Sequence, residues 1–387
     1  MCFKLLQPRL NYTLSFKEIM VALRSILFGY KLRNNTLKEI FSTNDIFYFD
    51  HARTGLQFVL SLLPKQSRVG VQPFTCHTVL EAIENAECKV IFVDINEQLV
   101  VDNQTLQQRI DEIDVLIVTH TFGYPVDVLE LKKKLPGKII IQDCCHAFLS
   151  KYNGNVVGRI GDFSLFSYGF AKFPSAIRGG YVIVNSSKYI DKFHQQYDKL
   201  STSTLKRELS ILFTSVIATT FYFPFVYTFL SSKIKERRRN LYYFKKASGM
   251  KIYKESSATH SLFDLQLLTI NEKLEIQQQN ANRIMEVLQK NSAFTVCQLS
   301  QESNFFMIPA YVNNPSRFIE FAKIRGVEIG QHFVQSINVI PSFGYQTGDC
   351  ENYERLIQKL VTFPSHYNYP ACKLNLLLSI IEAYTNE

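Results

Sequence analysis

The sequence predicts an α/β fold in which a mostly parallel central sheet is flanked by helices, followed by a smaller α+β unit. Two observations support this prediction. Between about residues 47 and 187, short apolar runs rich in β-branched residues alternate with segments of helical period. Polar residues gather where these apolar runs end, which is the edge at which open α/β sheets bind ligands. After residue 187 the alternation stops, and a separate strand and helix pattern begins near residue 304.

The individual elements follow from length, period and flanking turns. The expected strands of the sheet are Arg68–Gln72, Lys89–Asp94, Asp114–Thr119, Lys138–Gln142, Phe163–Phe166 and Tyr181–Val184. The expected helices between them are Arg53–Leu63, Thr78–Ala86 and Val126–Lys134. Further along, the pattern predicts a helical stretch over Phe263–Lys290, a strand at Phe305–Val312, and helices at Pro315–Arg325 and Lys373–Tyr384.

Composition limits the class of protein. The 387 residues suggest two or three structural units, which we divide into an N-terminal helical segment (1–45), a large α/β domain (46–250) and a small α+β domain (251–387). The net charge of +9 suits an anionic substrate, an acidic membrane surface or nucleic acid, without choosing among them. The eight cysteines show no metal-binding spacing, so we expect no metal centre and reduced thiols in a cytoplasm.

One segment departs from the α/β pattern. Residues 209–232 contain no charged side chain, and the basic run Lys233–Arg239 follows directly. The length is enough to cross the hydrocarbon core of a bilayer, which takes about 20 residues, but Pro224 interrupts the segment. One interpretation is peripheral membrane contact through 209–239, with the basic flank on the cytoplasmic face. The alternatives are a pair of buried helices broken at the proline and a contact between subunits.

Three places carry residues suited to chemistry. Asp143 directly follows an apolar strand, where a carboxylate implies a cationic partner or the N-cap of a following helix. Lys172 lies in an apolar loop between two strands, although a lone loop lysine is ordinarily solvated. Thr54 and Gly55 lie in a turn that opens a helix, where backbone amides can hold a phosphate. Individually, His77, His120 and His146 are more often structural than catalytic.

In order and spacing, these places resemble the DegT/DnrJ/EryC1/StrS family of sugar aminotransferases from about residue 45 to the C-terminus. The family consists of pyridoxal phosphate (PLP) enzymes of fold type I, with a large sheet domain and a smaller α+β domain. The segments that carry the resemblance are Ala52–Leu56, Cys88–Ile95, Thr119–Pro125, Ile141–Ala147, Gly161–Lys172, the pair Gly179-Gly180, Asp264–Gln266, and the run from Phe343 to His366.

The resemblance implies a role for several residues. Lys172 would bind the cofactor covalently, and Asp143 would pair with the pyridine nitrogen. Ser167, with Thr54 and Gly55, would bind the phosphate, and His146 would occupy the next active-site position.

The sequence departs from the family pattern around the cofactor. The usual ring-stacking aromatic after Thr75 is replaced by Cys76, with Phe74 and His77 beside it. Where the family has an asparagine that reaches the phosphate bound by the partner subunit, this sequence has Thr259 and His260; either could replace the asparagine, or the contact could be lost. Arg178 stands where an acidic residue often precedes the two glycines.

We therefore predict a PLP-dependent aminotransferase that moves an amino group from an amino acid, in the first instance glutamate, to a nucleotide-linked keto-sugar. The pathway would be cell-surface polysaccharide or secondary-metabolite biosynthesis. The expected partners are the amino donor, the keto-sugar and a second copy of the chain, with no nucleic acid. The expected location is the cytoplasm or the inner face of a membrane. Two alternatives remain: a membrane-associated enzyme with a lipid-linked acceptor, and a catalytically silent sensor or scaffold, against which Lys172, Asp143 and Ser167 argue.

Overall fold

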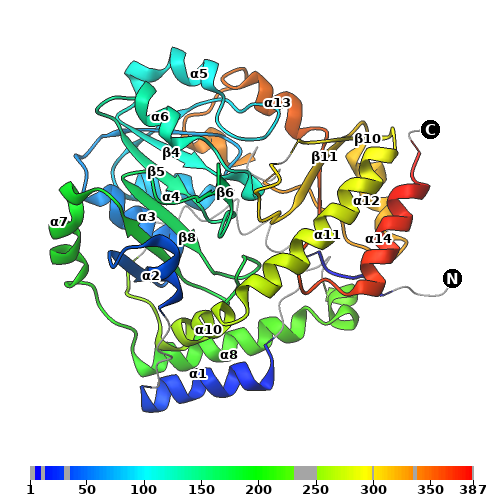
Figure 1. The fold of residues 1–387 in the computed structure, drawn as a ribbon, viewed down its shortest axis with the longest axis horizontal. Coiled ribbons are helices and arrows are strands. Elements are labelled where there is room, and N and C mark those ends of the chain that lie inside the picture. The colour runs from blue at the N-terminus through cyan, green and yellow to red at the C-terminus, as the bar shows by residue number, and fades with distance from the viewer. Residues whose placement is uncertain are drawn as a thin grey trace.

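The computed structural model describes residues 5–9, 14–29, 35–230, 251–298, 300–333 and 338–385. Its centre is a seven-stranded sheet with the order β1-β9-β8-β5-β4-β2-β3 (Figure 1). The strands are β1 (Ile46–Phe49), β2 (Arg68–Val71), β3 (Lys89–Phe92), β4 (Val115–Thr119), β5 (Ile139–Asp143), β8 (Phe163–Ser167) and β9 (Gly180–Val184).

Five neighbouring strands of this sheet, from β8 to β3, run parallel, and β9 runs antiparallel to both β8 and β1. The predicted α/β class with a mostly parallel sheet is therefore confirmed. Strand β1 was not among the expected strands, because its four residues at the sheet edge are too few to show a period. In the ladder between β4 and β5, Thr119 lies opposite Asp143, so the last residues of these two strands reach the same edge.

Helices cover both faces of the sheet because its strands are apolar on both sides. In β4, Val115 and Ile117 join the core cluster that includes Leu56 of helix α3. The intervening Leu116 and Val118 join a second cluster, which also contains side chains of α5 and α6. The helices of this unit are α3 (Ala52–Ser61), α4 (His77–Asn85), α5 (Asn103–Gln108), α6 (Val128–Lys134) and α7 (Ser187–Tyr197).

The C-terminal unit contains an antiparallel sheet of β10 (Phe294–Val296), β11 (Ile308–Val312) and β12 (Leu360–Phe363). It packs against α11 (Ile270–Lys290), α12 (Pro315–Lys323) and α14 (Ala371–Ala383), and it has its own hydrophobic cluster (Figure 1). Helix α13 (Glu351–Ile357) contributes Tyr353 and Leu356 to the core of the large unit instead. The limits of the predicted domains stay a prediction.

The single helical stretch expected over Phe263–Lys290 is instead divided into α10 (Ser257–Leu267) and α11, with a break at Leu268 and Thr269. Most residues of α10 are buried, whereas α11 is amphipathic and faces the small unit. Helix α10 packs in the core of the large unit and the later turns of α11 in the core of the small unit, and sequence period alone does not show the break between them.

The N-terminal segment binds to distant parts of the chain. Helix α1 (Phe16–Phe28) lies beside α10 and α8 (Leu205–Phe221), and the Ser25 hydroxyl bonds Ser257 O over 2.9 Å (Figure 1). Before α1, Gln7 forms a parallel bridge with Val327, and its backbone nitrogen donates to Gly326 O over 2.9 Å. The short helix α2 (Thr36–Phe41) follows α1 and leads into the sheet.

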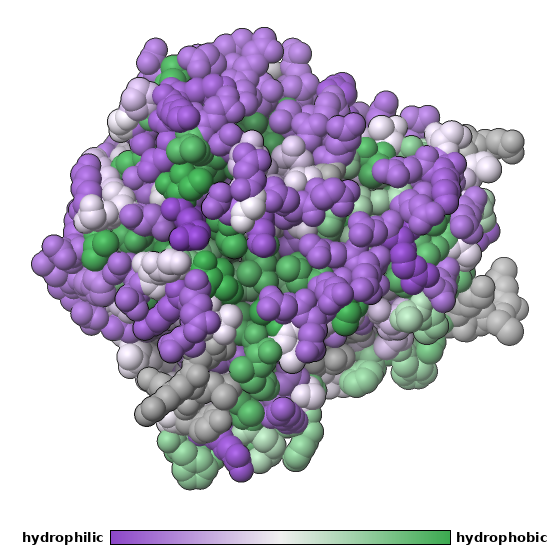
Figure 2. All heavy atoms as spheres, in the orientation of Figure 1, coloured by the Kyte–Doolittle hydropathy of each residue, from purple (hydrophilic) through white to green (hydrophobic). Residues whose placement is uncertain are grey.

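The described part of the apolar segment, residues 209–230, contains most of α8 and a second helix, Pro224–Leu230, bent by 86° relative to the first. In the part of the chain placed by the structure, no single helix is long and apolar enough to cross a membrane, although this bent pair passes when taken together. Leu209, Phe213 and Ile217 form an exposed stripe along α8. Figure 2 shows apolar residues along the lower edge, where α1 and α8 lie. The basic run 233–239 lies outside the described residues.

Candidate functional site

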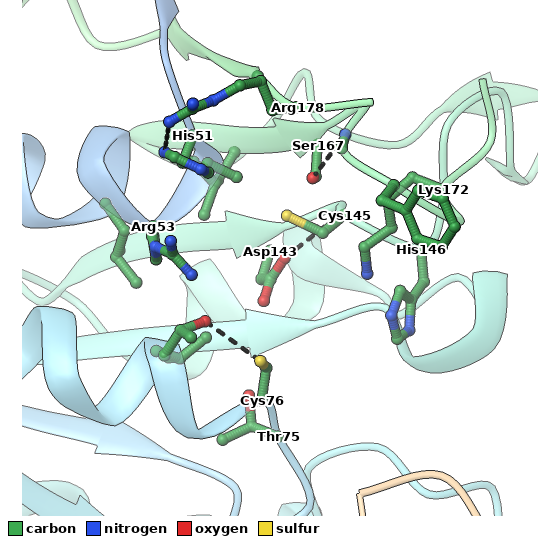
Figure 3. A pocket seen from close by; sticks show the side chains of 18 of the residues that line it. His51, Arg53, Thr75, Cys76, Asp143, Cys145, His146, Ser167, Lys172 and Arg178 are labelled. Carbon is green, nitrogen blue, oxygen red and sulfur yellow. Dashed lines mark hydrogen bonds between the residues drawn. The ribbon is translucent and has the colours of Figure 1, made fainter. Parts of the chain in front are cut away.

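A cavity of about 330 Å³ lies at the carboxyl ends of the central strands, where Thr119, Asp143 and Ser167 end β4, β5 and β8 (Figure 3). Lys172 and His146 line the same cavity. The remaining wall comes from the start of α3, the loop before α4, the turn before β9, and Phe333 from the C-terminal half of the chain. The structure therefore brings together the residues that the sequence predicted as the centre of a site.

Asp143 is the last residue of β5 and is 6% exposed. Its Oδ1 accepts a hydrogen bond from the Cys145 backbone amide over 3.0 Å. The residues after it form turns rather than a helix, so Asp143 is not a helix N-cap. Figure 3 shows the Asp143 carboxylate pointing into the cavity, and the Lys172 amine extends into the same cavity. A buried carboxylate in this position is suited to bind a cationic group of a ligand.

Lys172 lies in the loop that joins β8 to the antiparallel strand β9. Its backbone nitrogen donates to Gly169 O over 3.1 Å, and the His366 imidazole hydrogen-bonds its backbone. Its Nζ lies 5.4 Å from the centre of the Phe306 ring, a cation–π contact. The amine is therefore held at the cavity by a fixed backbone and an aromatic neighbour.

His146 is packed between aromatic rings and is 5% exposed. Its ring stacks on Phe306 at 4.5 Å and lies parallel to Phe122 at 5.8 Å. Burial, the Lys172 ammonium and His332 hold the pKa of His146 well below its usual value, so the imidazole is neutral near pH 7. Because its Nδ1 accepts from the Phe122 amide over 3.4 Å, the ring proton is on Nε2. His146 can therefore donate one hydrogen bond but carries no charge.

One end of the cavity is formed by the N-terminus of α3, where His51, Ala52 and Arg53 contribute to the wall. The predicted phosphate residues Thr54 and Gly55 do not line it. The Thr54 hydroxyl lies 2.8 Å from both Asp50 Oδ1 and His51 O.

Gly55 faces the sheet, since a Cβ there would lie 3.0 Å from a Val182 methyl carbon and 3.1 Å from a Phe49 ring carbon. Arg53 therefore faces the cavity, whereas Thr54 faces Asp50 and Gly55 faces the sheet.

Two guanidinium groups, from Arg53 and Arg178, line the same end of the cavity as Ser167 (Figure 3). Arg178 Nη2 lies 3.4 Å from His51 Nδ1 and 3.5 Å from Asp50 Oδ2. Burial and the two arginines lower the pKa of His51, although Asp50 opposes the shift. This end of the cavity is therefore cationic and suited to a phosphate.

Of the three candidates for covering a cofactor ring, only Cys76 lines the cavity. Phe74 is completely buried and packs edge-on against Phe122 and Phe333. His77 is the first residue of α4 and is not part of the wall.

The thiol of Cys76 is unusually acidic. Burial alone would raise its pKa, but hydrogen bonds with His77 and Thr78 lower it to about 7. Cys76 is thus partly a thiolate near neutral pH, whereas burial and Asp143 hold the pKa of the neighbouring Cys145 thiol well above its usual value.

Thr259 lies away from the cavity. It is completely buried in the first turn of α10, and its hydroxyl donates to Ser256 O over 3.0 Å. The role of Thr259 at a partner's phosphate stays a prediction.

His120 is also fully buried, and burial lowers its pKa to about 4. Its two ring nitrogens form hydrogen bonds with the Gln142 side chain and with the backbone.

Sequence reasoning did not single out His51, Arg53, Cys145 or Phe333. Arg53 could have been found from its place one residue before Thr54, at the opening of the helix. Phe333 could not, because it is distant in sequence and no local pattern marks it.

Comparisons with known proteins identify the family to which the chain belongs. The model of the DegT/DnrJ/EryC1/StrS aminotransferase family matches residues 52–371. GDP-perosamine synthase of Escherichia coli O157:H7 is 32% identical over 124 residues, which is 29% of this chain and 32% of that protein. The UDP-4-amino-4,6-dideoxy-N-acetyl-β-L-altrosamine transaminase of Campylobacter jejuni is 30% identical over 137 residues, 33% of this chain and 36% of that protein. These matches span about a third of each relative's length.

Solved structures share the fold over nearly the whole chain. The sugar aminotransferase CalS13 from Micromonospora echinospora superposes with a TM-score of 0.76 at 15% identity, covering 98% of this chain and 100% of that one. The E. coli GDP-4-keto-6-deoxy-D-mannose-3-dehydratase with bound hydrated PLP gives 0.75 at 15% identity, with the same coverage. At these identities the likeness shows the fold. Because the family model covers most of the sequence, the chain belongs to the DegT/DnrJ/EryC1/StrS aminotransferase family.

Proposed function

We propose that the protein is a PLP-dependent aminotransferase that moves the amino group of glutamate to a keto-sugar carried by a nucleotide. The observation that carries this proposal is the placement of the Asp143 carboxylate and the Lys172 amine in one cavity whose end is cationic. Relatives named as a perosamine synthase and an amino-sugar transaminase support a sugar as the acceptor. The product would enter cell-surface polysaccharide or secondary-metabolite biosynthesis.

The residues of the cavity fit PLP. The cofactor requires a carboxylate for its pyridine nitrogen, an amine for its aldehyde and a cradle for a phosphate dianion. Asp143, Lys172 and the wall formed by Ser167 with the start of α3 supply these three features in one cavity. The volume of about 330 Å³ lies at the small end of the range for ligand sites. When bound, the cofactor supplies an electron sink for the bond-breaking step at the amino-bearing carbon.

Each residue then has a physical task. Asp143 would pair with the pyridine nitrogen and keep it protonated, because a buried carboxylate stabilises a positive charge beside it. Lys172 would bind the cofactor aldehyde covalently, and once the amino donor displaces it, its Nζ would move the proton from the Cα of the donor. Ser167 and the first amides of α3 hold the phosphate. The neutral His146 packs beside Lys172 and keeps charge and water away from the amine.

An absorbance scan of the purified protein with added PLP tests this proposal. We expect a visible band from covalently bound cofactor, which glutamate bleaches while 2-oxoglutarate forms. Lys172→Ala should lack the band, and Lys188→Ala, on the surface helix α7, should keep it. Circular dichroism shows whether Lys172→Ala still folds. Absence of a Lys172-dependent band in folded protein overturns the proposal. A band that no amino acid bleaches would instead support the catalytically silent alternative.

We also infer that the protein is a homodimer, as the resemblance to the family implies. Light scattering on the purified chain measures its mass directly. A monomer at micromolar concentration would contradict this inference.

A second proposal concerns the insertion. We infer that α8 contacts a membrane surface, because Phe213 and Ile217 are 66% and 53% exposed on one stripe and Phe16 of the adjoining helix α1 is 79% exposed. An exposed apolar stripe of this kind lies flat in the interface of a bilayer. Such placement would favour a lipid-linked acceptor.

Flotation with vesicles of phosphatidylcholine and phosphatidylglycerol tests the contact. We expect the protein to float and the double substitution Phe213→Ser with Ile217→Ser to abolish flotation. Ile276→Ser, at an exposed apolar position on α11, is the matched control and should still float. Wild-type protein that does not float would overturn this inference, and a double variant that changes the mass of the assembly would assign the stripe to a subunit contact.

A further inference from the structure

We propose that residues 365–368 of the C-terminal unit form a clamp that sets the position of Lys172, with His366 as the positioning residue. This inference rests on the proposed function, because it concerns the lysine that would hold the cofactor. The clamp follows β12 and meets the Lys172 loop, residues 168–179 between β8 and β9. It is not part of the described wall of the cofactor cavity, so His366 would act through Lys172 rather than on a ligand.

The backbone of the Lys172 loop is strained on both sides of the lysine. Ala171 has φ +62° and Ile177 has φ +80°, and both values lie in the left-handed region. For a β-branched residue such as isoleucine this conformation is an outlier. Residues in such conformations keep them only where the surrounding structure fixes the backbone. Contacts from outside the loop are therefore needed to keep Lys172 in one place.

His366 binds the backbone of Lys172 from outside the loop. Within the loop, the Phe170 amide donates to Ile177 O over 2.7 Å, and the Lys172 amide donates to Gly169 O over 3.1 Å. The His366 imidazole also hydrogen-bonds the Lys172 backbone. Because the amide of Lys172 already donates within the loop, its carbonyl oxygen is the acceptor for His366.

The His366 imidazole is prepared to donate this bond. Its Nδ1 accepts a hydrogen bond from the Asn368 amide over 3.2 Å, so the ring proton is on Nε2. Burial lowers the pKa of His366 to about 4, although the bond to Lys172 opposes the shift. The ring is therefore neutral near pH 7. It donates one hydrogen bond and adds no charge near the Lys172 amine.

The clamp is itself held by α11 and is tied to a second contact with the lysine. The Asn280 side-chain amide on α11 donates to Ser365 O and to the following carbonyl oxygen, each over 3.3 Å. The Ser365 hydroxyl donates to Phe305 O, and the ring of the next residue, Phe306, contacts the Lys172 amine. The C-terminal unit thus holds Lys172 at its backbone and at its Nζ.

A packing contact reinforces the hydrogen bond. The ring of Tyr367 meets that of Phe173, the residue after Lys172, edge-on at 6.0 Å between centres, and Phe173 is buried. One amine that binds the cofactor and later moves a proton must return to the same place in each step. Misplacement by about 1 Å can lower a rate about 100-fold. A bond to the Lys172 backbone therefore supports catalysis without touching a substrate.

Two substitutions at His366 separate the hydrogen bond from the packing of the ring. His366→Phe keeps a ring and removes the donor, whereas His366→Gln keeps an N–H donor and removes the ring. We expect His366→Phe to slow formation of the Lys172-dependent PLP band and to lower kcat, each about tenfold, the order of effect of one hydrogen bond. The KM for glutamate should not change, because His366 does not contact the donor. His366→Gln should stay within about twofold of wild type.

His194→Phe, at an exposed position on α7, is the matched control and should behave as wild type does. Equal rates for wild type and His366→Phe overturn the inference. It is likewise overturned if His366→Gln is impaired as much as His366→Phe or more, because the ring rather than the hydrogen bond would then be needed. Should His366→Phe not fold, Asn280→Ala, which releases the clamp from α11, takes its place with the same expected slowing and the same contrary outcome.

Hydrogen exchange on the protein without PLP separates this inference from the proposed function. Mass spectrometry of the peptide that covers the Lys172 loop should show faster exchange in His366→Phe and wild-type exchange in His366→Gln. If wild type forms no Lys172-dependent band, the aminotransferase proposal fails, and the exchange rates still test the clamp. A working aminotransferase in which His366→Phe leaves the exchange of this peptide unchanged overturns only the clamp.

Discussion

The backbone amide of Cys145 donates a hydrogen bond to Oδ1 of Asp143 over 3.0 Å. The carboxylate is thereby fixed at the end of β5, with its remaining oxygen directed into the cavity (Figure 3). This geometry gives Asp143 a single orientation toward any cationic group that binds there. A substitution at this position should therefore remove the charge of Asp143 and keep its shape.

Asp143→Asn should lower the rate of the glutamate half-reaction by about 100-fold or more, because a neutral amide cannot stabilise a protonated pyridine nitrogen. Stopped-flow measurement of the bleaching of the cofactor band checks this. Asp198→Asn, at an exposed position after α7, is the control and should react at the wild-type rate. An Asp143→Asn variant that transaminates normally would remove Asp143 from the proposed mechanism.

Cys76 should be alkylated by iodoacetamide with a rate that rises through about pH 7, since hydrogen bonds with His77 and Thr78 lower its pKa to that value. The rate follows the thiolate fraction, so the thiol is already mostly reactive at pH 8. His77→Gln should move the midpoint upward, and bound PLP should protect the thiol. Mass spectrometry of the labelled peptide is the measurement. Cys145, whose pKa is raised, is the internal control and should label slowly at pH 7.

Asp50→Asn should destabilise the fold by about 3–5 kcal/mol at pH 7, because it leaves Arg178 and Arg207 beside a buried site without their carboxylate. Burial opposes ionisation, but His51, Thr54 and Arg178 together lower the pKa of Asp50 below its usual value. A lowered folded-state pKa gives stability that is present above the unfolded pKa and is lost as the pH falls through the folded one. Urea unfolding at pH 7 and below pH 4 should show the difference from wild type shrinking in acid.

Gly180→Ala should destabilise the protein by about 2 kcal/mol or more, because backbone atoms surround the position and cannot move aside. A Cβ there would lie 2.5 Å from Phe166 O and 2.7 Å from the Ala52 nitrogen and Cα. Gly137→Ala is the control: it adopts φ +78° in open space, so only backbone strain of about 1 kcal/mol is expected. Thermal unfolding compares the two. Equal losses would show that the contact with Ala52 relaxes freely.

Much of the architecture could be predicted from sequence because it depends on local patterns. The apolar runs of β2 to β5 and the helices between them are periodic over enough residues to be recognised. Asp143 and Lys172 stand beside apolar strands, but only the order of the motifs shared with the family identified them as site residues, together with Ser167. The structure places all three in one cavity.

The features that the sequence could not predict depend on which way side chains and helices point and on contacts between residues that are distant in sequence. The sequence predicts Thr54 and Gly55 at the phosphate, whereas in the structure Arg53 lines the cavity and Thr54 faces Asp50, a difference that only the phase of the helix reveals. Phe74 and Cys76 are two positions apart in the sequence, yet Phe74 is buried and Cys76 lines the cavity. The break between α10 and α11 depends on which core each helix joins.

The strand-like segment around Gln7 connects parts of the molecule that are far apart in sequence. Gln7 bridges to Val327, six residues before Phe333 in the cavity wall. The preceding Leu6 amide donates to the Thr228 hydroxyl in the insertion over 2.9 Å. The start of the chain is therefore a mechanical link between the apolar helices and the rim of the active site. If α8 docks on a membrane as proposed, this link would connect the docked helices to the segment that leads to Phe333.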